Sequence, residues 1–151
     1  GLYDKARVDF IKSISRSQPF TSIMIDLDHF KSINDTYGHA VGDQVLRELA
    51  KRCKSCVRDI DIVGRYGGEE FLIVLPDTNA ETGLIVAERL RSAIANRPML
   101  VGEDISLNVT ASLGVAEKQN TTTSLEMVIL RADQAMYIAK HKGRNRVAIS
   151  T

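Results

Sequence analysis

The chain lacks several features that would each assign it to a broad class of protein. No run of apolar residues approaches the roughly 18 that a membrane-spanning helix needs, and no charged, then apolar, then small-residue segment opens the chain as a signal peptide would. Neither sign of charge dominates, because 20 Lys and Arg stand against 19 Asp and Glu, for a formal net charge of +1. The sequence therefore offers no broad basic field for a nucleic acid polymer, and any bound nucleotide would be a small ligand.

Cysteine is also scarce, since Cys53 and Cys56 are the only two and form a C-x-x-C. That spacing can indicate redox chemistry or half of a zinc site, but no second pair is present to complete four ligands. Both cysteines instead continue an apolar stripe at helical spacing. The stripe comprises Val41, Val45, Leu46, Leu49, Cys53, Cys56 and Val57. We expect the two thiols to pack in or beside the core.

The 151 residues, of which 44% are hydrophobic, are sufficient for one buried core, so we expect a single domain over 1–151. Residues 1–13 are expected to pass from loop into helix, and residues 27–40 to be irregular. Periodicity and capping boxes predict helices over about 39–57, from Thr78 and Glu81 to Arg97-Pro98, and from Thr123 and Glu126 to Gly143. Strands are predicted over 20–26, 60–66, 69–75, 105–116 and 145–149, the fourth being half-buried because it alternates strictly.

This order of elements predicts an α/β (α+β) fold. The β-α-β-β-α-β core with an added α-β fits one mixed, largely antiparallel sheet with helices on its faces. In such a core the strand over 20–26 lies centrally, beside the hairpin of 60–66 and 69–75.

The hairpin tip carries the stretch RYGGEEF, residues 65–71. Glycine supplies the positive φ that a two-residue hairpin loop needs. Glu69 and Glu70 are not needed for the turn, and they are either solvated surface charge, as paired acids after a tight turn usually are, or carriers of chemistry. Asp26 would approach them from the end of the central strand. Carboxylates that meet from two strands repel each other unless a divalent cation neutralises them, and Mg²⁺ is the natural candidate.

Several of these polar residues also have a structural interpretation. Asp26 and Asp28 could cap the turn after their strand. Asn34 and Asp43 could cap a helix, or they could clamp guanine, whose N1–H and N2–H₂ donors adenine does not present together. The cations Lys140, Lys142, Arg144 and Arg146 suit a helix C-terminus.

Four separated motifs resemble the GGDEF domain, the catalytic domain of bacterial diguanylate cyclases. They are GGEEF, DLDHFKSINDTYGHAVGD, VTASLGVA and RADQAMYIAKHKGRN, in the family's order and spacing over nearly the whole chain. The resemblance implies a palm-like nucleotidyl cyclase fold and an enzyme that joins two GTP into cyclic di-GMP with loss of two pyrophosphates. It further implies a homodimer and two Mg²⁺ per active site, with Mn²⁺ as a substitute.

The resemblance also implies roles for individual residues. The metal ligands would be Asp26, the Leu27 carbonyl, Glu69 and Glu70. Glu69 would accept the proton of the attacking 3′-hydroxyl, Glu70 would be a further catalytic acid of the signature, and Lys31 would stabilise the transition state. The substrate-binding residues would be Asn34, His39, Asp43, Gly67, Gly68, Lys140 and Arg144. The two glycines would leave the backbone open to a phosphate.

A further motif lies just ahead of the hairpin. Arg58 and Asp61 form an R-x-x-D that is similar to the site at which many cyclases of this family bind their own product, with Arg89 as a secondary contact. The alternative is a surface ion pair worth at most about 1 kcal/mol.

The start of the chain departs from the family pattern, because Asp4 and Lys5 stand where an Asn-Arg pair is usual. We expect a piece of a longer cytoplasmic protein whose N-terminal sensor region could be membrane-anchored, and whose absence would weaken dimerisation. The piece itself is expected to make no membrane contact.

The main alternative function is a regulatory module that holds GTP or cyclic di-GMP without turnover. Asp43 disfavours a mixed guanine-adenine product, and the low net charge disfavours a polymerase fragment.

Overall fold

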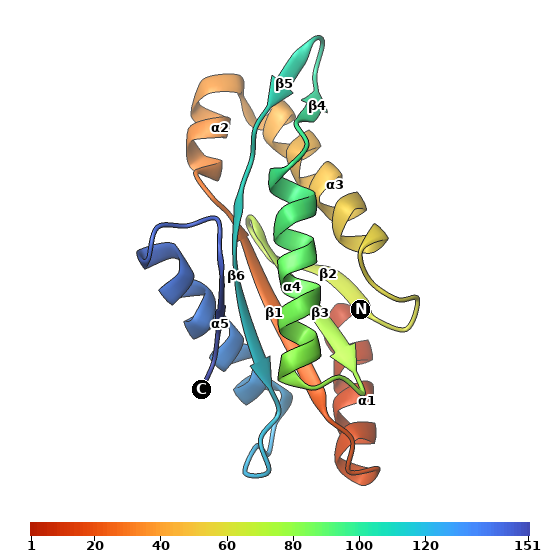
Figure 1. Ribbon diagram of the computed structural model, residues 1–151. Helices are drawn as coiled ribbons and strands as arrows, with labels where there is room; N and C mark the ends of the chain where they lie inside the picture. The colour runs from red at the N-terminus through yellow and green to blue at the C-terminus, as the bar shows by residue number, and fades with distance from the viewer.

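The core of the protein is a five-stranded sheet, seen in a computed structural model that describes residues 1–151 (Figure 1). The strand order is β2-β3-β1-β6-β7, and all neighbours are antiparallel except β6 and β7. The strands are β1 (Phe20–Leu27), β2 (Ile62–Gly67), β3 (Glu70–Pro76), β6 (Ala111–Glu117) and β7 (Val147–Ile149). The mixed, largely antiparallel sheet is confirmed, and β1 lies at its centre beside β3.

Helices cover both faces of this sheet. They are α1 (Leu2–Ser15), α2 (Phe30–Tyr37), α3 (His39–Ser55), α4 (Ala80–Ala95) and α5 (Leu125–His141). Side chains alternate along β1, so Ile23 and Ile25 join α3 and α4 in one core while Met24 joins α1 and α5 in the other. All eight residues of β1 are consequently buried. None of the five helices combines the length and apolarity needed to cross a membrane.

The structure corrects the predicted alternating strand over 105–116. It is divided into β5 (Ile105–Leu107), which pairs with β4 (Met99–Val101) in a separate two-stranded ribbon, and β6. The first six residues of β6 are all buried rather than alternating, because α4 packs on one face of it and α5 on the other.

The helix boundaries also differ from the predicted ones. α1 begins at Leu2, where a loop was expected, and α2 occupies part of the region expected to be irregular. Only Phe30 and Ile33 anchor α2 to the core, which is too weak a pattern to reveal a helix. The N-caps of α4 and α5 are Asn79 and Ser124, each one residue after the threonine of the proposed capping box.

The cysteines lie on α3 and immediately after it, as the apolar stripe predicts. Cys53 is fully buried and Cys56 partly buried, and neither is in a disulfide. Burial raises the pKa of the Cys53 thiol to about 12. Both residues pack with the core.

Candidate functional site

The end of β1 and the tip of the β2–β3 hairpin bring carboxylates together. Asp26 stands opposite Glu70 in the antiparallel register. Burial raises the pKa of the Asp26 carboxyl; Lys140 lowers it, and the charges of Glu69 and Asp28 add to the rise. The pKa of Glu70 is raised by burial and then by the charges of Asp133, Asp26 and Glu69. The acids therefore share one electrostatic environment, as the order of the strands predicts.

The hairpin tip is shifted by one residue from its predicted place. Gly67 is the last residue of β2 and pairs with Glu70, so the two-residue loop is Gly68–Glu69. Only Gly68 has a positive φ, of +37°. The structural need for glycine therefore applies to Gly68, whereas Gly67 is an ordinary strand residue next to a register irregularity. Glu69 is therefore the second residue of the loop and lies at its tip.

Asp26 already has one partner. Lys140, near the end of α5, places Nζ 2.6 Å from Asp26 Oδ2, while Asp26 Oδ1 is buried and accepts no hydrogen bond. An unpaired buried carboxylate oxygen is costly unless a ligand satisfies it. It thus offers a position for a cation beside the hairpin.

The donor set suits a metal that needs few protein ligands. No group of three or more His, Cys, Asp and Glu side chains converges closely enough to hold a metal alone. Mg²⁺ is commonly held by one or two carboxylates together with substrate phosphates, so Asp26, Leu27 and Glu69 at the ends of neighbouring elements fit this pattern. The structure thus lacks a complete protein cage but has the carboxylates that a nucleotide-dependent magnesium site requires.

Asp28 does not join this group. Its carboxylate is buried and accepts from Thr110 Oγ1, Ser112 Oγ and the backbone N–H of Asn145. Of the two aspartates in MIDLDHF, Asp28 therefore has a structural role, whereas Asp26 keeps an unpaired oxygen.

A pocket of about 360 Å³ opens beside the hairpin tip, between α2 and α3. It brings together many of the residues expected to bind the substrate, and its lining comprises Phe30, Lys31, Asn34, His39, Asp43, Leu46, Arg65, Gly68 and Glu69. Neither Asn34 nor Asp43 caps a helix, since the N-caps of α2 and α3 are His29 and Gly38. The capping alternative is thereby removed, and both polar groups line the pocket.

Gly42 supports this pocket and was missed from the sequence. A methyl group in place of its hydrogen would overlap Asn34 Oδ1. The glycine lets α2 and α3 approach closely enough to place Asn34 in the wall of the pocket. A glycine inside an otherwise regular helix pattern was the available signal.

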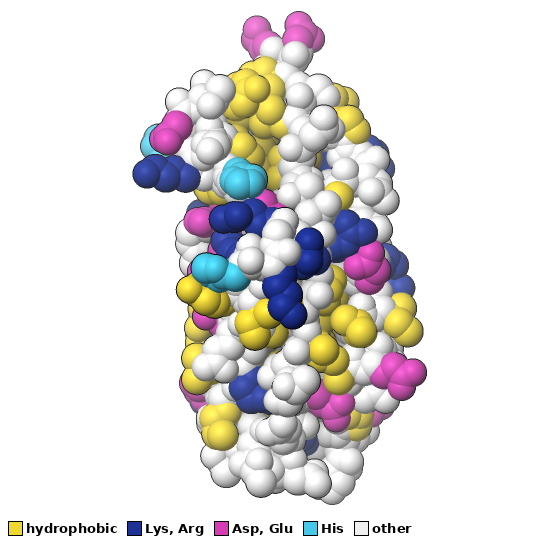
Figure 2. Space-filling view, turned by 60° about the vertical axis from the view of Figure 1, so that its left-hand side comes forward, with side chains coloured by type: hydrophobic (Ala, Val, Ile, Leu, Met, Phe, Trp, Pro, Cys, Tyr) yellow, Lys and Arg dark blue, Asp and Glu magenta, His cyan; other side chains and the backbone are white.

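The cations at the end of α5 divide into two groups. Lys140 holds Asp26, as described, whereas Arg144 lies in the exposed loop between α5 and β7. Figure 2, which turns the α5 side forward, shows Lys, Arg and His side chains gathered near the middle of this face. Neither Lys140 nor Arg144 lines the pocket between α2 and α3.

The R-x-x-D residues line a different pocket, of about 340 Å³, which Arg58, Asp61 and Arg89 share. Arg58 Nη2 lies 2.7 Å from Asp61 Oδ1, and the Arg58 backbone N–H donates to Asp61 Oδ2. Arg89 donates twice to the Cys56 carbonyl. The ion pair is not a simple surface pair, because the side chain of Asp61 is only 3% exposed while that of Arg58 is 52% exposed.

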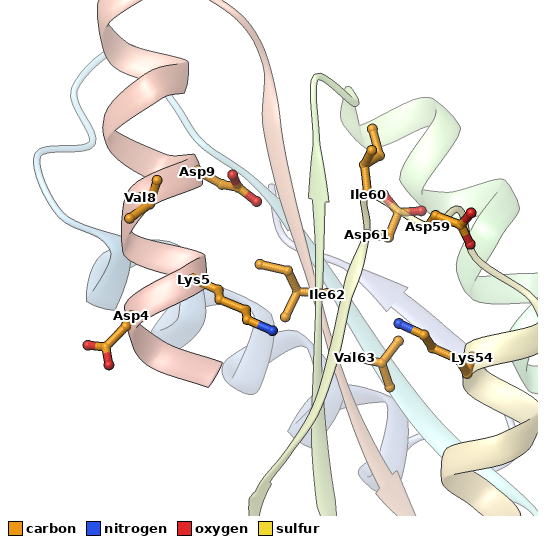
Figure 3. A pocket seen from close by; sticks show the side chains of 10 residues that line it. All are labelled: Asp4, Lys5, Val8, Asp9, Lys54, Asp59, Ile60, Asp61, Ile62 and Val63. Atoms are coloured by element: carbon orange, nitrogen blue, oxygen red, sulfur yellow. The ribbon is translucent and has the colours of Figure 1, made fainter. Parts of the chain in front are cut away.

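A third hollow, of about 480 Å³, lies between α1 and β2 (Figure 3). Lys5 from α1 and Lys54 from α3 flank Ile62 and Val63 of β2. β2 is an edge strand, and flanking charges of this kind protect such edges from unwanted pairing.

Comparison with known proteins places the chain in one family. The family model described as "Diguanylate cyclase, GGDEF domain" matches residues 5–146. The chain is 44% identical over 135 residues to Diguanylate cyclase A of Treponema denticola, covering 89% of this chain and 36% of that protein. It is 47% identical over 131 residues to the response regulator PleD of Caulobacter vibrioides, covering 85% of this chain and 29% of that protein. The chain thus spans about a third of the length of these curated relatives.

Solved structures agree with the fold. The active GGEEF domain of a diguanylate cyclase from Vibrio cholerae superposes with a TM-score of 0.93 at 38% identity, covering 99% of this chain and 94% of that one. The GGDEF domain of DgcB from Caulobacter crescentus, in complex with c-di-GMP, has a TM-score of 0.91 at 32% identity, covering 97% and 84%. By motifs, fold and similarity over nearly its whole length, the chain belongs to the GGDEF domain family of diguanylate cyclases.

Proposed function

We propose that this domain condenses two molecules of GTP into cyclic di-GMP and releases two pyrophosphates. The observation that carries the proposal is the meeting of Asp26, Glu69 and Glu70 beside a pocket whose wall contains Asn34 and Asp43. The three carboxylates suit a metal-bound polyphosphate, and the pocket wall with Asn34 and Asp43 suits guanine. Membership of the family supports the same reaction.

The base would lie between α2 and α3. The exposed carboxylate of Asp43 can accept from N1–H and N2–H₂ of guanine, and no protein group competes for it in a hydrogen bond. Asn34 turns its Oδ1 into the protein beside Gly42, which leaves its amide nitrogen as the group that can donate to the base. His39 and Phe30 complete the wall.

The phosphates would extend from the pocket toward the hairpin tip. Asp26, the Leu27 carbonyl, Glu69 and Glu70 would hold two Mg²⁺, or Mn²⁺, and these ions would supply charge neutralisation for the phosphates. Lys31 lines the same pocket and would balance charge that develops in the transition state. Lys140 pairs with Asp26 and opposes the rise in its pKa that burial causes, and it would be available to a phosphate once Asp26 has another partner. Arg144 would add a second phosphate contact.

Proton removal would fall to Glu69. This carboxylate lies in the exposed hairpin loop and lines the pocket, where a 3′-hydroxyl can reach it. Each domain offers one such pocket for GTP. Joining two GTP molecules therefore needs two domains that face each other, and we include a homodimer in the proposal.

The proposal extends to product control. The pocket shared by Arg58, Asp61 and Arg89 would bind cyclic di-GMP, with Arg58 forking onto a phosphate or the O6/N7 edge of guanine. Asp61 would accept hydrogen bonds from the N1–H and N2–H₂ groups of guanine. For this, Arg58 would have to give up its ion pair with Asp61. Because this pocket shares no residue with the one between α2 and α3, the product would inhibit without competing with GTP.

The direct test is incubation of the domain with GTP and Mg²⁺, followed by chromatography of the products. A leucine-zipper fusion that forces a dimer is run beside the parent chain, so that weak association does not conceal the activity. We expect cyclic di-GMP and pyrophosphate from the fusion. A fusion that binds GTP but releases no cyclic di-GMP would support the regulatory module instead.

A further inference from the structure

Asp28 is the member of the MIDLDHF motif that the proposed reaction does not use. It lies directly after β1, and its side chain is nearly inaccessible, with the residue 3% exposed. Thr110 Oγ1 donates to Oδ2 at 2.7 Å, Ser112 Oγ donates to Oδ1 at 2.7 Å, and the Asn145 backbone N–H donates to Oδ2 at 2.9 Å. All three donors come from β6 or the residues around it and from the loop after α5, and none comes from the hairpin.

The loop that Asp28 contacts has a strained backbone. Gly143, Arg144 and Asn145 have consecutive positive φ angles of 125°, 65° and 44°. Residues other than glycine rarely adopt such angles, and two in succession persist only where the surroundings hold them in place. Asp28 provides one such restraint at Asn145, and Arg91 of α4 provides another by donating to Asn145 Oδ1 at 2.8 Å.

The same loop adjoins the cations proposed to meet the phosphates. Lys140, in the last turn of α5, pairs with Asp26, and Arg144 precedes the residue whose N–H contacts Asp28. Asp26 thus holds the end of α5 through Lys140, and Asp28 holds the loop that follows through Asn145. A shift of that loop would move Arg144 away from the end of β1.

We propose that Asp28 is a positioning residue, which holds the loop of residues 142–146 so that Arg144 is presented to the phosphates of a bound nucleotide. This role rests on the proposed function for its catalytic consequence. It assigns the two aspartates of the motif different tasks, with Asp26 in contact with the metal and substrate and Asp28 acting through Arg144.

The competing role for Asp28 is that of a further metal ligand, and an isosteric variant separates the two. A metal ligand needs the carboxylate charge, whereas a positioning residue needs hydrogen-bond partners of the correct shape. In Asp28→Asn the amide oxygen can still accept from Thr110 and Asn145. The amide nitrogen can donate to Ser112, whose hydroxyl can accept as well as donate.

The experiment compares the parent with Asp28→Asn and Asp28→Ala, and uses Ser112→Ala as the matched control. The control removes one bond of Asp28 and leaves the bond to Asn145 in place. GTP affinity is measured by calorimetry with Mg²⁺, and turnover is measured in the zipper-fused dimer. We expect Asp28→Asn and Ser112→Ala to bind GTP within about threefold of the parent, and Asp28→Ala to bind at least about tenfold more weakly.

Two further measurements address the route through the loop. Hydrogen exchange at the Asn145 amide should accelerate in Asp28→Ala but not in Asp28→Asn, a result that does not depend on any enzymatic activity. Arg144→Ala should weaken GTP binding in the parent and add little in the Asp28→Ala background, because the loop is already displaced. If Asp28→Ala does not fold, Asp28→Ser, which keeps one acceptor, takes its place.

Three results would overturn the proposal. The first is a loss of GTP affinity in Asp28→Asn as large as that in Asp28→Ala. The second is an equal loss of GTP affinity in Ser112→Ala and Asp28→Ala, and the third is unchanged hydrogen exchange at the Asn145 amide in Asp28→Ala. A parent dimer that binds GTP without condensing it would contradict the proposed function only, because the affinity and exchange measurements would still report on Asp28.

Discussion

At the scale of single residues, the site depends on which atoms are left without partners. Asp26 Oδ1 and Asn34 Oδ1 are buried side-chain oxygens that accept no hydrogen bond. The carboxylate of Asp28 is fully engaged instead, because it accepts from three donors. Within the MIDLDHF motif, Asp28 is thus built into the fold, whereas Asp26 keeps an oxygen that is available to a ligand.

The first prediction concerns the carboxylates that are proposed to bind the metal. Asp26→Asn and Glu69→Gln should each lower cyclic di-GMP formation at least about a hundredfold in a forced dimer, because each removes a charge without changing volume. Unchanged circular dichroism and an unchanged urea midpoint would show that the fold is intact. Activity within about twofold of the parent would remove these residues from the metal site.

The second prediction concerns base selection by Asp43. Asp43→Ser removes the carboxylate that accepts from N1–H and N2–H₂ of guanine, so the preference for GTP over ATP should fall by about tenfold or more. Competition between the two nucleotides for binding measures the ratio. Asp35→Ser, an exposed acid on α2 outside the pocket lining, is the control. A preference that does not change would show that Asp43 takes no part in base recognition.

The third prediction concerns the thiol of Cys53. Its pKa of about 12 lies above the ordinary thiol value because burial disfavours the thiolate, so at pH 8 only roughly one part in ten thousand is reactive. Cys56→Ser, which retains Cys53 alone, should therefore resist iodoacetamide until denaturant is added. Mass spectrometry of the native protein checks this, and rapid labelling there would show that the helix opens readily.

At the scale of elements, the two pockets proposed to bind nucleotides are formed by contacts between neighbouring segments. The pocket between α2 and α3 depends on their close approach at Gly42. The pocket of Arg58, Asp61 and Arg89 is formed where the turn before β2 meets α4. Each pocket should therefore respond to changes in the packing of elements as well as to changes in ligand-contacting residues.

A prediction follows for Gly42→Ala. Alanine in a helix interior normally adds about 0.5 to 1 kcal/mol of stability relative to glycine. Here its methyl group would overlap Asn34 Oδ1, so that gain should be lost and GTP should bind about tenfold more weakly. Chemical denaturation and calorimetry measure the two effects. In Asn34→Ala, which removes the overlapping amide and leaves only the Phe30 ring 3.2 Å from the methyl group, the same substitution should recover most of its stabilising effect.

The pocket of Arg58, Asp61 and Arg89, proposed to bind the product, gives the last prediction at this scale. Arg58→Ala should abolish binding of cyclic di-GMP at micromolar concentrations, because the guanidinium that can fork onto the ligand is lost. Calorimetry compares it with Arg7→Ala, which removes an exposed arginine that pairs with Glu126 instead. Equal affinities for the two variants, or no binding to the parent, would leave Arg58 and Asp61 as a structural ion pair.

At the scale of the whole molecule, the fold places the two pockets so that they share no lining residue. One domain holds one set of carboxylates at one hairpin tip, so the proposed cyclisation of two GTP would require a second copy. Turnover per chain should consequently depend on protein concentration in the parent. In the zipper fusion it should be at least about tenfold higher at submicromolar concentration and independent of dilution, because the second domain is present at a high effective concentration. Equal activity per chain for both forms would contradict the dimer.

The sequence by itself determined the family, the central position of β1 and the meeting of Asp26 with the hairpin acids. These follow from hydrophobic periodicity, strand order and motif spacing, which are local properties of the chain. The sequence pattern placed the hairpin loop one residue too early. It also did not predict α2, because the two apolar residues Phe30 and Ile33 span only one helical turn and do not establish a periodicity.

Only the tertiary structure decided how the polar groups are partnered. Asp28 receives its hydrogen bonds from residues 82, 84 and 117 positions further along the chain, and Asp26 meets Lys140 across the sheet. Such pairings depend on strand register and on how α5 packs against the sheet, and neither is encoded in any local pattern of residues. That is why two aspartates of one motif, equivalent in the sequence, have different partners in the folded protein.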